Sequence, residues 1–575
     1  MVRIPTLASP PWHDKTDALC ARGERRGPAR ADAVTPGPGA RRGGARRART
    51  PIWYLGPVTP SLLLAIDQGT TGTTAIVMDV AGKVVGRASR ELPQHHPEPG
   101  WVEHDAEELW ETVVGAVADG LHAADVPGAA VAAIGITNQR ETTLLWDRGT
   151  GQPARRAIVW QDRRTAAACA ELRTRGHEPE VRAATGLVLD PYFSGTKIAW
   201  ALADDPALRR RAEAGTVAFG TVDSYLVMRL AGGPAAGAPH VTDVTNASRT
   251  LLFDLERHAF SPRLCAILGV PTAVLPRVVP SAGIVARTAG CPGLPDGVPI
   301  AGLAGDQHAA LFGQACFEPG DAKCTYGTGA FVLVNTGPRP LRSRSGLVST
   351  VAWQIGDEVT YAIEGSAFVA GAAVQWLRDG LGLITTAAEV EALALEVDSS
   401  DGVVFVPALT GLGAPHWDPG ARGVIAGLTR RTRAAHLARA TLEGIAHQID
   451  DLLTAVAGDL GAPLRTLRVD GGAAANDLLL TLQCELSGVA VERPRELEST
   501  ARGAAMLAGI GVGLFASPRD AARLLEVDRT FRPTLSATER ESRRARWRRA
   551  VERARSDHEP VAGRAPGGDG HRASG

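Results

Sequence analysis

The chain has 575 residues, of which 44% are hydrophobic and 22% are charged. A single core stops growing near ~250–300 residues, so the length predicts two large domains. The chain has 62 basic and 62 acidic side chains, and its formal net charge is +0. A balanced charge creates no overall field toward nucleic acid or an anionic membrane. We therefore expect a small substrate and no nucleic-acid partner.

Cysteine use and hydropathy indicate the compartment. The seven cysteines lie far apart, with no Cys-x-x-Cys pair, which favours reduced thiols over a disulfide framework or a zinc site. No run approaches the ~20 apolar residues that a membrane-spanning helix needs. The sequence therefore predicts a cytoplasmic protein with no transmembrane segment.

The two ends of the chain differ in composition from the rest. Residues 1–60 are rich in Arg, Pro, Gly and Ala and show no apolar periodicity, and such a composition cannot offset the entropy of ordering. We expect a disordered extension, or a start codon assigned too early, rather than an import leader, because Pro and Gly interrupt every potential amphipathic helix. Residues 555–575 have a similar composition and predict a disordered tail.

Strand and helix patterns alternate between these ends. The apolar run 62–66, a Gly/Thr turn and the run 75–78 predict a strand–turn–strand unit. Helical periodicity begins near Ala106, and another strand is expected at 131–136. A second strand–Gly turn–strand unit follows at 324–334.

Two similar units of this kind suggest a duplicated architecture. We therefore expect an α/β fold with two domains, residues 61–315 and 316–554, and a cleft between them.

Two Gly/Thr loops are candidates for phosphate binding. The segment Asp67–Thr74 reads Asp-Gln-Gly-Thr-Thr-Gly-Thr-Thr directly after an apolar strand. A tight hairpin here would present backbone N–H groups and Thr hydroxyls to phosphate oxygens, and Asp67 would hold a metal ion through water. An ordinary hairpin turn explains this segment equally well when it is taken alone. The loop 326–329, Tyr-Gly-Thr-Gly, would hold a polyphosphate from the other side in a duplicated fold.

A third glycine-rich segment is Asp470–Asn476, which reads Asp-Gly-Gly-Ala-Ala-Ala-Asn after the strand-like run 464–469. Glycines at a strand-to-helix junction let a flat ring approach the backbone. Asn476 either caps the helix that follows or contacts a nucleotide, and the spacing does not choose between these roles.

Two polar pairs close apolar strands. Arg140–Glu141 lie just beyond the strand 134–137, at the carboxyl edge of a sheet, where α/β proteins bind ligands. A guanidinium beside a carboxylate matches the needs of vicinal hydroxyls, although a surface ion pair is the ordinary alternative. Asp306–Gln307 follow the apolar segment 300–305, where a carboxylate is either a helix N-cap or a base facing the cleft.

Four long segments carry a family resemblance. They are residues 99–105 (Pro-Gly-Trp-Val-Glu-His-Asp), 135–143 (Gly-Ile-Thr-Asn-Gln-Arg-Glu-Thr-Thr), 190–197 (Asp-Pro-Tyr-Phe-Ser-Gly-Thr-Lys) and 411–419 (Gly-Leu-Gly-Ala-Pro-His-Trp-Asp-Pro). With these segments the chain resembles the glycerol kinases, in the family of sugar and polyol kinases, over residues 62–554. The resemblance implies two actin-like, ribonuclease-H-like domains flanking a nucleotide cleft.

The resemblance also implies a role for each matching residue. Glycerol hydroxyls would be contacted by Arg140, Glu141, Tyr192, Asp306 and Gln307, and its carbon side by Trp160 and Phe331. The phosphates of ATP would lie on Thr70, Thr71, Gly72 and Thr328, and the rest of the nucleotide on Gly371, Gln375, Gly472 and Asn476. Asp67 would lie near Mg²⁺, and Asp306 would be the catalytic base. The expected reaction of glycerol catabolism forms sn-glycerol 3-phosphate and ADP, and the expected assembly is a homo-oligomer, a dimer or tetramer.

Two positions depart from the family pattern. Thr74 stands where glycerol kinases carry an arginine after the first phosphate loop, so one phosphate contact is expected to be missing. Residues 288–295 lack the Gly-Lys-Gly-Gly-Thr-Arg stretch that binds fructose 1,6-bisphosphate in enterobacterial relatives, so we expect no feedback inhibition by that sugar.

Other functions fit parts of the sequence. A related kinase for another polyol or ketose, such as xylulose or erythritol, is the enzyme alternative, although Arg140–Glu141 with Trp160 and Tyr192 favours a three-carbon substrate. An actin-like ATPase would use the same nucleotide cleft without any polyol-binding residues. An inactive scaffold is disfavoured because Asp67, Asp306 and both loops are intact.

Overall fold

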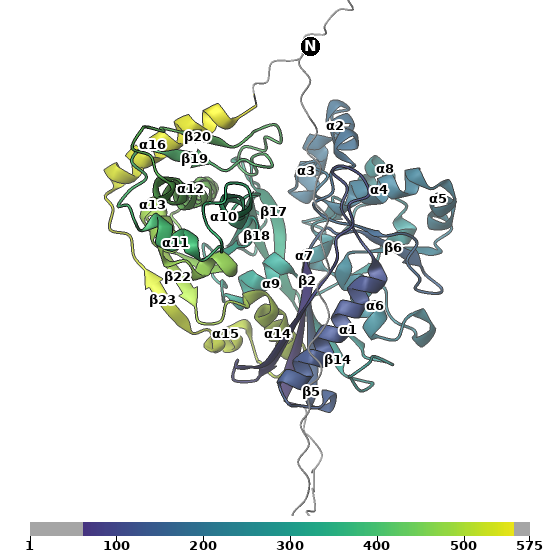
Figure 1. Ribbon diagram of the computed structural model, residues 1–575. Coiled ribbons are helices and arrows are strands. Elements are labelled where there is room, and N and C mark those ends of the chain that lie inside the picture. Colours follow the sequence, from purple (N-terminus) through teal and green to yellow (C-terminus); the bar gives the residue numbers. More distant parts are fainter. Residues whose placement is uncertain (1–60, 557–575) are drawn as a thin grey trace, which may run out of the picture. The chain divides into compact units, whose positions relative to one another are not determined.

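The computed structural model describes residues 61–556 (Figure 1). The predicted disordered extension at 1–60 and nearly all of the predicted tail at 555–575 lie outside the described residues. Within the described part, no helix is both long and apolar enough to cross a bilayer.

A mixed sheet of 13 strands runs through the described residues, in the order β23-β22-β21-β15-β16-β18-β17-β13-β14-β5-β1-β2-β3. Its strands are β1 (Leu62–Gln68), β2 (Gly72–Asp79), β3 (Val84–Glu91), β5 (Val131–Asn138), β13 (Ala282–Arg287), β14 (Pro299–Gly305), β15 (Ala322–Tyr326), β16 (Ala330–Gly337), β17 (Val348–Ile355), β18 (Glu358–Ala367), β21 (Thr466–Asp470), β22 (Ala490–Pro494) and β23 (Val527–Phe531). Residues from both predicted domains therefore join one sheet, and β13 pairs with β17 through Ala282 and Ile355 alone. The division into two domains at residue 315 stays a prediction.

The two predicted strand–turn–strand units are present and have the same surroundings. β1 pairs antiparallel with β2 and parallel with β5. β15 likewise pairs antiparallel with β16 and parallel with β21. The prediction of two similar hairpins is confirmed.

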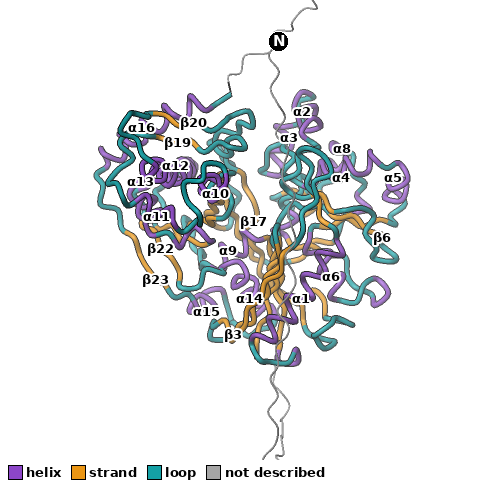
Figure 2. Tube along the Cα trace, viewed as in Figure 1, coloured by secondary structure: helices purple, strands orange, loops and turns teal. Residues whose placement is uncertain are grey.

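Alternation along these strands separates two faces of the sheet. On β1, Leu64 and Ile66 pack in one core cluster with α1 (Ala106–Ala123), whereas Leu63 and Ala65 pack in another with α14 (Ser499–Gly511). Figure 2 shows the strands of this region gathered between α1 and α14.

Helices α9 (Asp306–Gly313) and α14 cross at very close range, although they are far apart in the sequence (Figure 1). A Cβ added at Gly503 of α14 would lie 1.9 Å from the carbonyl oxygen of Ala309 on α9. Only glycine permits this approach. The crossing packs α14, from late in the chain, against the helix that begins at Asp306.

The remaining helices surround the sheet. They are α2 (Ala166–Thr174), α3 (Glu178–Thr185), α4 (Ser194–Asp204), α5 (Pro206–Glu213), α6 (Val222–Leu230), α7 (Val244–Ala247), α8 (Pro262–Leu268), α10 (Gly371–Asp379), α11 (Glu389–Ala394), α12 (Ala434–Leu460), α13 (Asp477–Ser487), α15 (Pro518–Ala521) and α16 (Ala537–Ala554). Five small antiparallel or parallel pairs complete the fold: β4 (Glu103–His104) with β7 (Ala157–Ile158), β6 (Leu144–Asp147) with β8 (Val217–Gly220), β9 (Val241–Asp243) with β12 (Arg277–Val279), β10 (Phe253–Asp254) with β11 (Ala259–Phe260), and β19 (Val404–Val406) with β20 (Val424–Ala426).

Candidate functional site

The carboxyl ends of three neighbouring strands bring the first group of predicted residues together. Asp67 is near the end of β1, Arg140 follows the end of β5, and Asp306 follows β14 directly. Because β5 lies between β1 and β14 and runs parallel to both, these ends meet at one edge of the sheet. The Arg140 Nε atom lies 3.1 Å from Asp306 Oδ1.

Arg140 is buried, with 2% of its side chain exposed, and each of its three guanidinium nitrogens lies beside an oxygen of a neighbouring side chain. Its Nη2 donates to the Tyr192 hydroxyl at 3.2 Å and to Glu364 Oε1 at 3.1 Å, and its Nη1 donates to the other Glu364 oxygen. The neighbouring Glu141 carboxylate is farther away, at 3.9 Å from Arg140 Nε. The predicted pair therefore belongs to a larger buried network and is not a surface ion pair.

Two members of this network, Arg249 and Glu364, were not predicted from the sequence. Arg249 Nε donates to Glu141 Oε1 at 2.7 Å, and its Nη2 donates to Glu364 Oε1 at 3.0 Å. All four side chains are at most 2% exposed. The sequence held one sign of Glu364: it is a charged residue within a run of apolar and small residues in β18. A charge is rarely buried in such a strand without a partner.

Burial and charge act in opposite directions on the two carboxylates. Burial alone would raise the pKa of Glu364, but Arg140 and Arg249 outweigh it and lower this pKa to about 2. For Glu141, burial raises the pKa by more than Arg140 and Arg249 lower it. The difference follows from geometry, because Glu364 accepts hydrogen bonds from both guanidinium groups and Glu141 from Arg249.

Three aromatic rings border the Arg140 region. Trp160 meets Tyr192 edge to face, with ring centroids 5.6 Å apart, and meets Phe331 of β16 at 6.3 Å. The Trp160 indole Nε1 also donates to Thr70 Oγ1 at 2.8 Å. The structure thus gathers the three predicted aromatic residues beside the first Gly/Thr loop.

Asp306 is the first residue of α9, whose N-cap is Gly305. Its Oδ1 accepts a hydrogen bond from Gln307 N at 2.7 Å, and 29% of its side chain is exposed. Gln307 is held in turn by Lys323, a buried residue of β15 whose Nζ donates to Gln307 Oε1 and, at 2.9 Å, to Thr325 Oγ1. Asp306 is therefore the more accessible member of this pair.

Both Gly/Thr loops form tight turns. In the first, Gly69 N donates to Gly72 O at 2.8 Å, and Thr71 is exposed. In the second, Gly327 N donates to Gly329 O at 2.9 Å, and Thr328 is exposed.

The second loop lies against the start of α10. Thr328 O accepts from Ala370 N at 2.8 Å, and a Cβ at Gly371 would lie 2.6 Å from Gly327 O. The loop thus requires glycine at 371, the first residue of a helix whose N–H groups favour anions. Gln375 lies on this helix and is exposed.

The segment Asp470–Asn476 connects β21 to α13. Gly472 is exposed at the start of a short 3-10 helix. The Asn476 Oδ1 atom accepts from Leu479 N at 2.7 Å and so caps α13. Of the two roles considered for Asn476, capping is present, and contact with a nucleotide stays a prediction.

Several carboxylates crowd the edge of the sheet at Asp67. Burial raises the pKa of Asp67 well above its usual range, and Asp306, Glu498 and Asp470 raise it further. Both carboxylate oxygens of Asp470 are buried and lack a hydrogen-bond partner within residues 61–556. No group of three His, Cys, Asp or Glu side chains in the described part could hold a metal directly. These acids therefore fit a cation held through water, which is how Mg²⁺ is usually bound.

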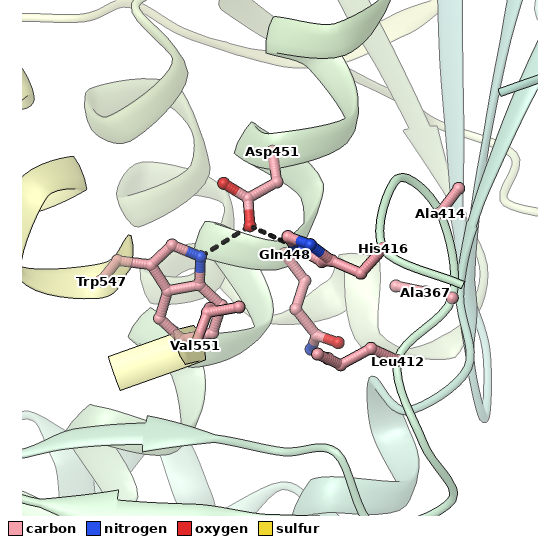
Figure 3. Close-up of a pocket in the computed structure, with 9 residues that line it drawn as sticks. Ala367, Leu412, Ala414, His416, Gln448, Asp451, Trp547 and Val551 are labelled. Atoms are coloured by element: carbon pink, nitrogen blue, oxygen red, sulfur yellow. Dashed lines mark hydrogen bonds and ion pairs between the residues drawn. The ribbon is translucent and has the colours of Figure 1, made fainter. Parts of the chain in front are cut away.

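A small cavity of about 10 Å³ lies elsewhere, between α12 and α16. Figure 3 shows His416, Asp451 and Trp547 beside it, and Trp547 Nε1 donates to Asp451 Oδ2 at 2.7 Å. Space of this size holds about one water molecule. Part of the segment 411–419 therefore packs against α12 and α16 at this point.

Comparisons with known proteins define the class to which this arrangement belongs. Residues 62–313 match the N-terminal domain of the FGGY family of carbohydrate kinases, and residues 322–512 match its C-terminal domain. These segments make up most of the chain. The chain belongs to the FGGY family of carbohydrate kinases.

Individual relatives narrow the comparison. A glycerol kinase from Myxococcus xanthus is 55% identical over 494 residues, which are 86% of this chain and 99% of that protein. A glycerol kinase from Aromatoleum aromaticum is 56% identical over 495 residues, again 86% and 99% of the two chains. The crystal structure of Plasmodium falciparum glycerol kinase with ADP matches with a TM-score of 0.80 at 34% identity, over 86% of this chain and 98% of that one. The predicted resemblance and the predicted fold class are confirmed.

Proposed function

We propose that this protein transfers the γ-phosphate of ATP to glycerol, forming sn-glycerol 3-phosphate and ADP. The observation that carries the proposal is the meeting of Arg140, Tyr192 and Asp306 beside the first phosphate loop, with Trp160 bonded to Thr70. Polar groups for hydroxyls, an aromatic wall for carbon and a loop for phosphate thus adjoin one another. The relatives named above support glycerol as the acceptor.

The proposed step is an in-line displacement. A terminal hydroxyl of glycerol attacks the γ-phosphorus, the bond from that phosphorus to the β,γ-bridging oxygen breaks, and ADP leaves. Asp306 accepts the hydroxyl proton, because its carboxylate is partly exposed while Glu141 and Glu364 are buried in ion pairs. Phosphoryl transfer depends mainly on positioning and charge stabilisation, which a rigid Arg140 and two phosphate loops provide.

Glycerol would be bound by Arg140, Glu141, Tyr192, Asp306 and Gln307, with its carbon side on Trp160 and Phe331. ATP phosphates would lie on Thr70, Thr71, Gly72 and Thr328, and the rest of the nucleotide on Gly371, Gln375, Gly472 and Asn476. These assignments rest on the family resemblance. The gathering of Thr328 and Gly371 at the start of α10 supports a polyphosphate there.

Asp67 and Asp470 would hold Mg²⁺ through water. Two observations favour this: the pKa of Asp67 is raised by burial and by the acids around it, and the Asp470 carboxylate lacks hydrogen-bond partners within the described residues. When bound, the cation would neutralise charge on the phosphate oxygens.

The test is ADP release by the purified protein, measured with and without glycerol and with a panel of other polyols and ketoses. We expect ADP release to require Mg²⁺ and to rise many-fold with glycerol. Turnover that ignores glycerol would indicate an actin-like ATPase. A higher kcat/KM for xylulose or erythritol would indicate a different acceptor. Size-exclusion chromatography with light scattering tests the homo-oligomer, a dimer or tetramer, that we also propose from the resemblance.

A further inference from the structure

Glu364 holds an unusual position for a charged residue. It lies on β18, 1% exposed, and is 224 residues along the chain from Arg140. Its two oxygens accept hydrogen bonds from both terminal nitrogens of Arg140 and from Arg249 Nη2. The two guanidinium groups offset the cost of burying the Glu364 charge. Hydrogen bonds between charged groups are stronger than those between neutral groups.

This carboxylate fixes the plane of the Arg140 guanidinium. A bidentate pair uses two nitrogens of a planar, rigid fork, so the third nitrogen has a fixed direction. That third nitrogen, Nε, points to Asp306 at 3.1 Å. The Nη2 atom reaches the Tyr192 hydroxyl at 3.2 Å. Arg140 therefore contacts Asp306 and Tyr192, its two proposed partners in glycerol binding, only in the orientation that Glu364 fixes.

Arg249 connects Glu364 to Glu141 through its guanidinium group. Its side chain is fully buried, and it joins Glu364 Oε1 at 3.0 Å to Glu141 Oε1 at 2.7 Å. Its guanidinium lies 5.2 Å from the centre of the Phe193 ring, within the range of cation–π attraction. The Glu141 backbone has a left-handed φ of 58°, which costs energy for a non-glycine residue. Hydroxyls of Ser194 and Thr143 donate to the Glu141 carbonyl oxygen at 3.0 and 3.1 Å, and Arg249 holds its carboxylate.

The anchor of this network lies next to the second phosphate loop. Glu364 is paired across the sheet with Leu333 of β16, the strand that carries Phe331 and follows the loop at 327–329. β18 itself ends at Ala367, shortly before α10 begins at Gly371. The orientation of Arg140 therefore depends on strands that border the proposed ATP site.

We propose that Glu364 and Arg249 are positioning residues for the glycerol site: Glu364 orients Arg140 toward Asp306 and Tyr192, and Arg249 carries that hold to Glu141. The inference rests on the proposed function, because it assigns Arg140 and Glu141 to glycerol. A buried ion pair with a purely structural role is the competing explanation. The two differ in kinetics, because a structural role gives no reason for glycerol to be affected more than ATP.

The experiment compares E364Q, E364D and R249K with the wild-type protein and with E358Q, which changes an exposed glutamate at the start of the same strand. We expect KM for glycerol to rise about 10- to 100-fold in E364Q, because a charged hydrogen bond is lost, while KM for ATP changes less than about 3-fold. E364D keeps the charge but is shorter, so its KM for glycerol should lie between wild type and E364Q. R249K should resemble E364D, and E358Q should match wild type.

The outcomes separate this inference from the proposed function. If wild-type protein does not phosphorylate glycerol, the proposed function fails and this inference fails with it. If wild type is active and E364Q raises both KM values equally, or raises neither, the positioning role is wrong. Should E364Q not fold, E364D and R249K decide: wild-type KM for glycerol in both, with melting temperatures lowered, would leave only a structural ion pair.

Discussion

Replacing Asp306 by Asn tests the proposed base most directly. Asn keeps the size of the side chain and an oxygen that can accept from Gln307 N, a bond of 2.7 Å in the structure. Gly305, not Asp306, is the N-cap of α9, and Asn serves helix N-termini about as well as Asp. The fold should therefore lose little stability, apart from the contact of the Asp306 charge with Arg140 Nε at 3.1 Å.

The expected loss is in catalysis. Asn cannot accept the hydroxyl proton, and general-base catalysis contributes on the order of 10²–10⁴-fold, which corresponds to about 2.7–5.4 kcal/mol of the barrier. Arg140 keeps its two bonds to Glu364 in the variant, so KM for ATP should change little. We therefore expect a low kcat with near-normal ATP affinity.

The assay is coupled ADP release at saturating glycerol and ATP, together with a melting temperature. Asp205→Asn is the matched control, because Asp205 is an exposed N-cap of α5 that accepts from Ala207 N and Leu208 N. The control should keep full kcat. If Asp306→Asn retains more than about a tenth of wild-type kcat, Asp306 is not the base.

Three further predictions follow from the same region. Arg140→Ala should lower kcat/KM for glycerol about 10- to 150-fold, and it should also cost roughly 3–5 kcal/mol of stability, because it removes one partner of a buried ion pair. Asp67→Asn should abolish turnover yet raise the melting temperature in Mg²⁺-free buffer by a few degrees, a gain of about 1–2 kcal/mol. Thr74→Arg should lower KM for ATP about 3- to 10-fold, since it adds a charged donor for phosphate.

The physical reasons define what would contradict each of these three. An acid whose pKa is raised by folding costs stability at every pH above its unfolded value of 3.8, and the melting gain of Asp67→Asn should therefore vanish as the pH falls to that value. Thr74 pairs with Asp67 across the β1–β2 hairpin and so shares its face; an unchanged KM for ATP would show that the position lies outside the phosphate site. Equal loss for both substrates in Arg140→Ala would indicate a structural ion pair.

Much of the site could be predicted from local sequence. The two Gly turns follow apolar strands directly, so their hairpins are set by residues close in the chain. Asp67, Arg140 and Asp306 were expected at strand ends because apolar runs stop just before them, and parallel strands bring such ends together. The aromatic residues Trp160, Tyr192 and Phe331 were assigned by resemblance, and the structure places their rings side by side.

The buried network could not be predicted in the same way. Glu364 meets Arg140 across 224 residues, and Arg249 across 115, so no local pattern fixes the pairing. The single sheet of 13 strands was missed for a related reason. The sheet is continuous because β13 pairs with β17 through one residue pair. A single pair changes the apolar pattern of neither strand, so the sequence of each strand does not show that they are neighbours.

The two hairpins have the same frame but different chemistry. Counting from the first glycine of each turn, Asp67 of β1 corresponds to Thr325 of β15. On the parallel neighbours, Thr137 lies beside Asp67 and Asp470 beside Thr325. Each half thus carries one carboxylate and one threonine at this level, with the order exchanged.

Because of this exchange, the two halves of the duplicated fold are not equivalent. The acids of the two halves lie near enough for Asp470 to raise the pKa of Asp67, which suits one cation shared between them. Arg140 follows β5, the neighbour of β1, and Asp306 follows β14 on the far side of β5, whereas Lys323 lies on β15 of the second hairpin. Under the proposed function, the repeated hairpins would supply the two phosphate loops, and the residues that differ between the copies would suit one side to glycerol and the other to ATP.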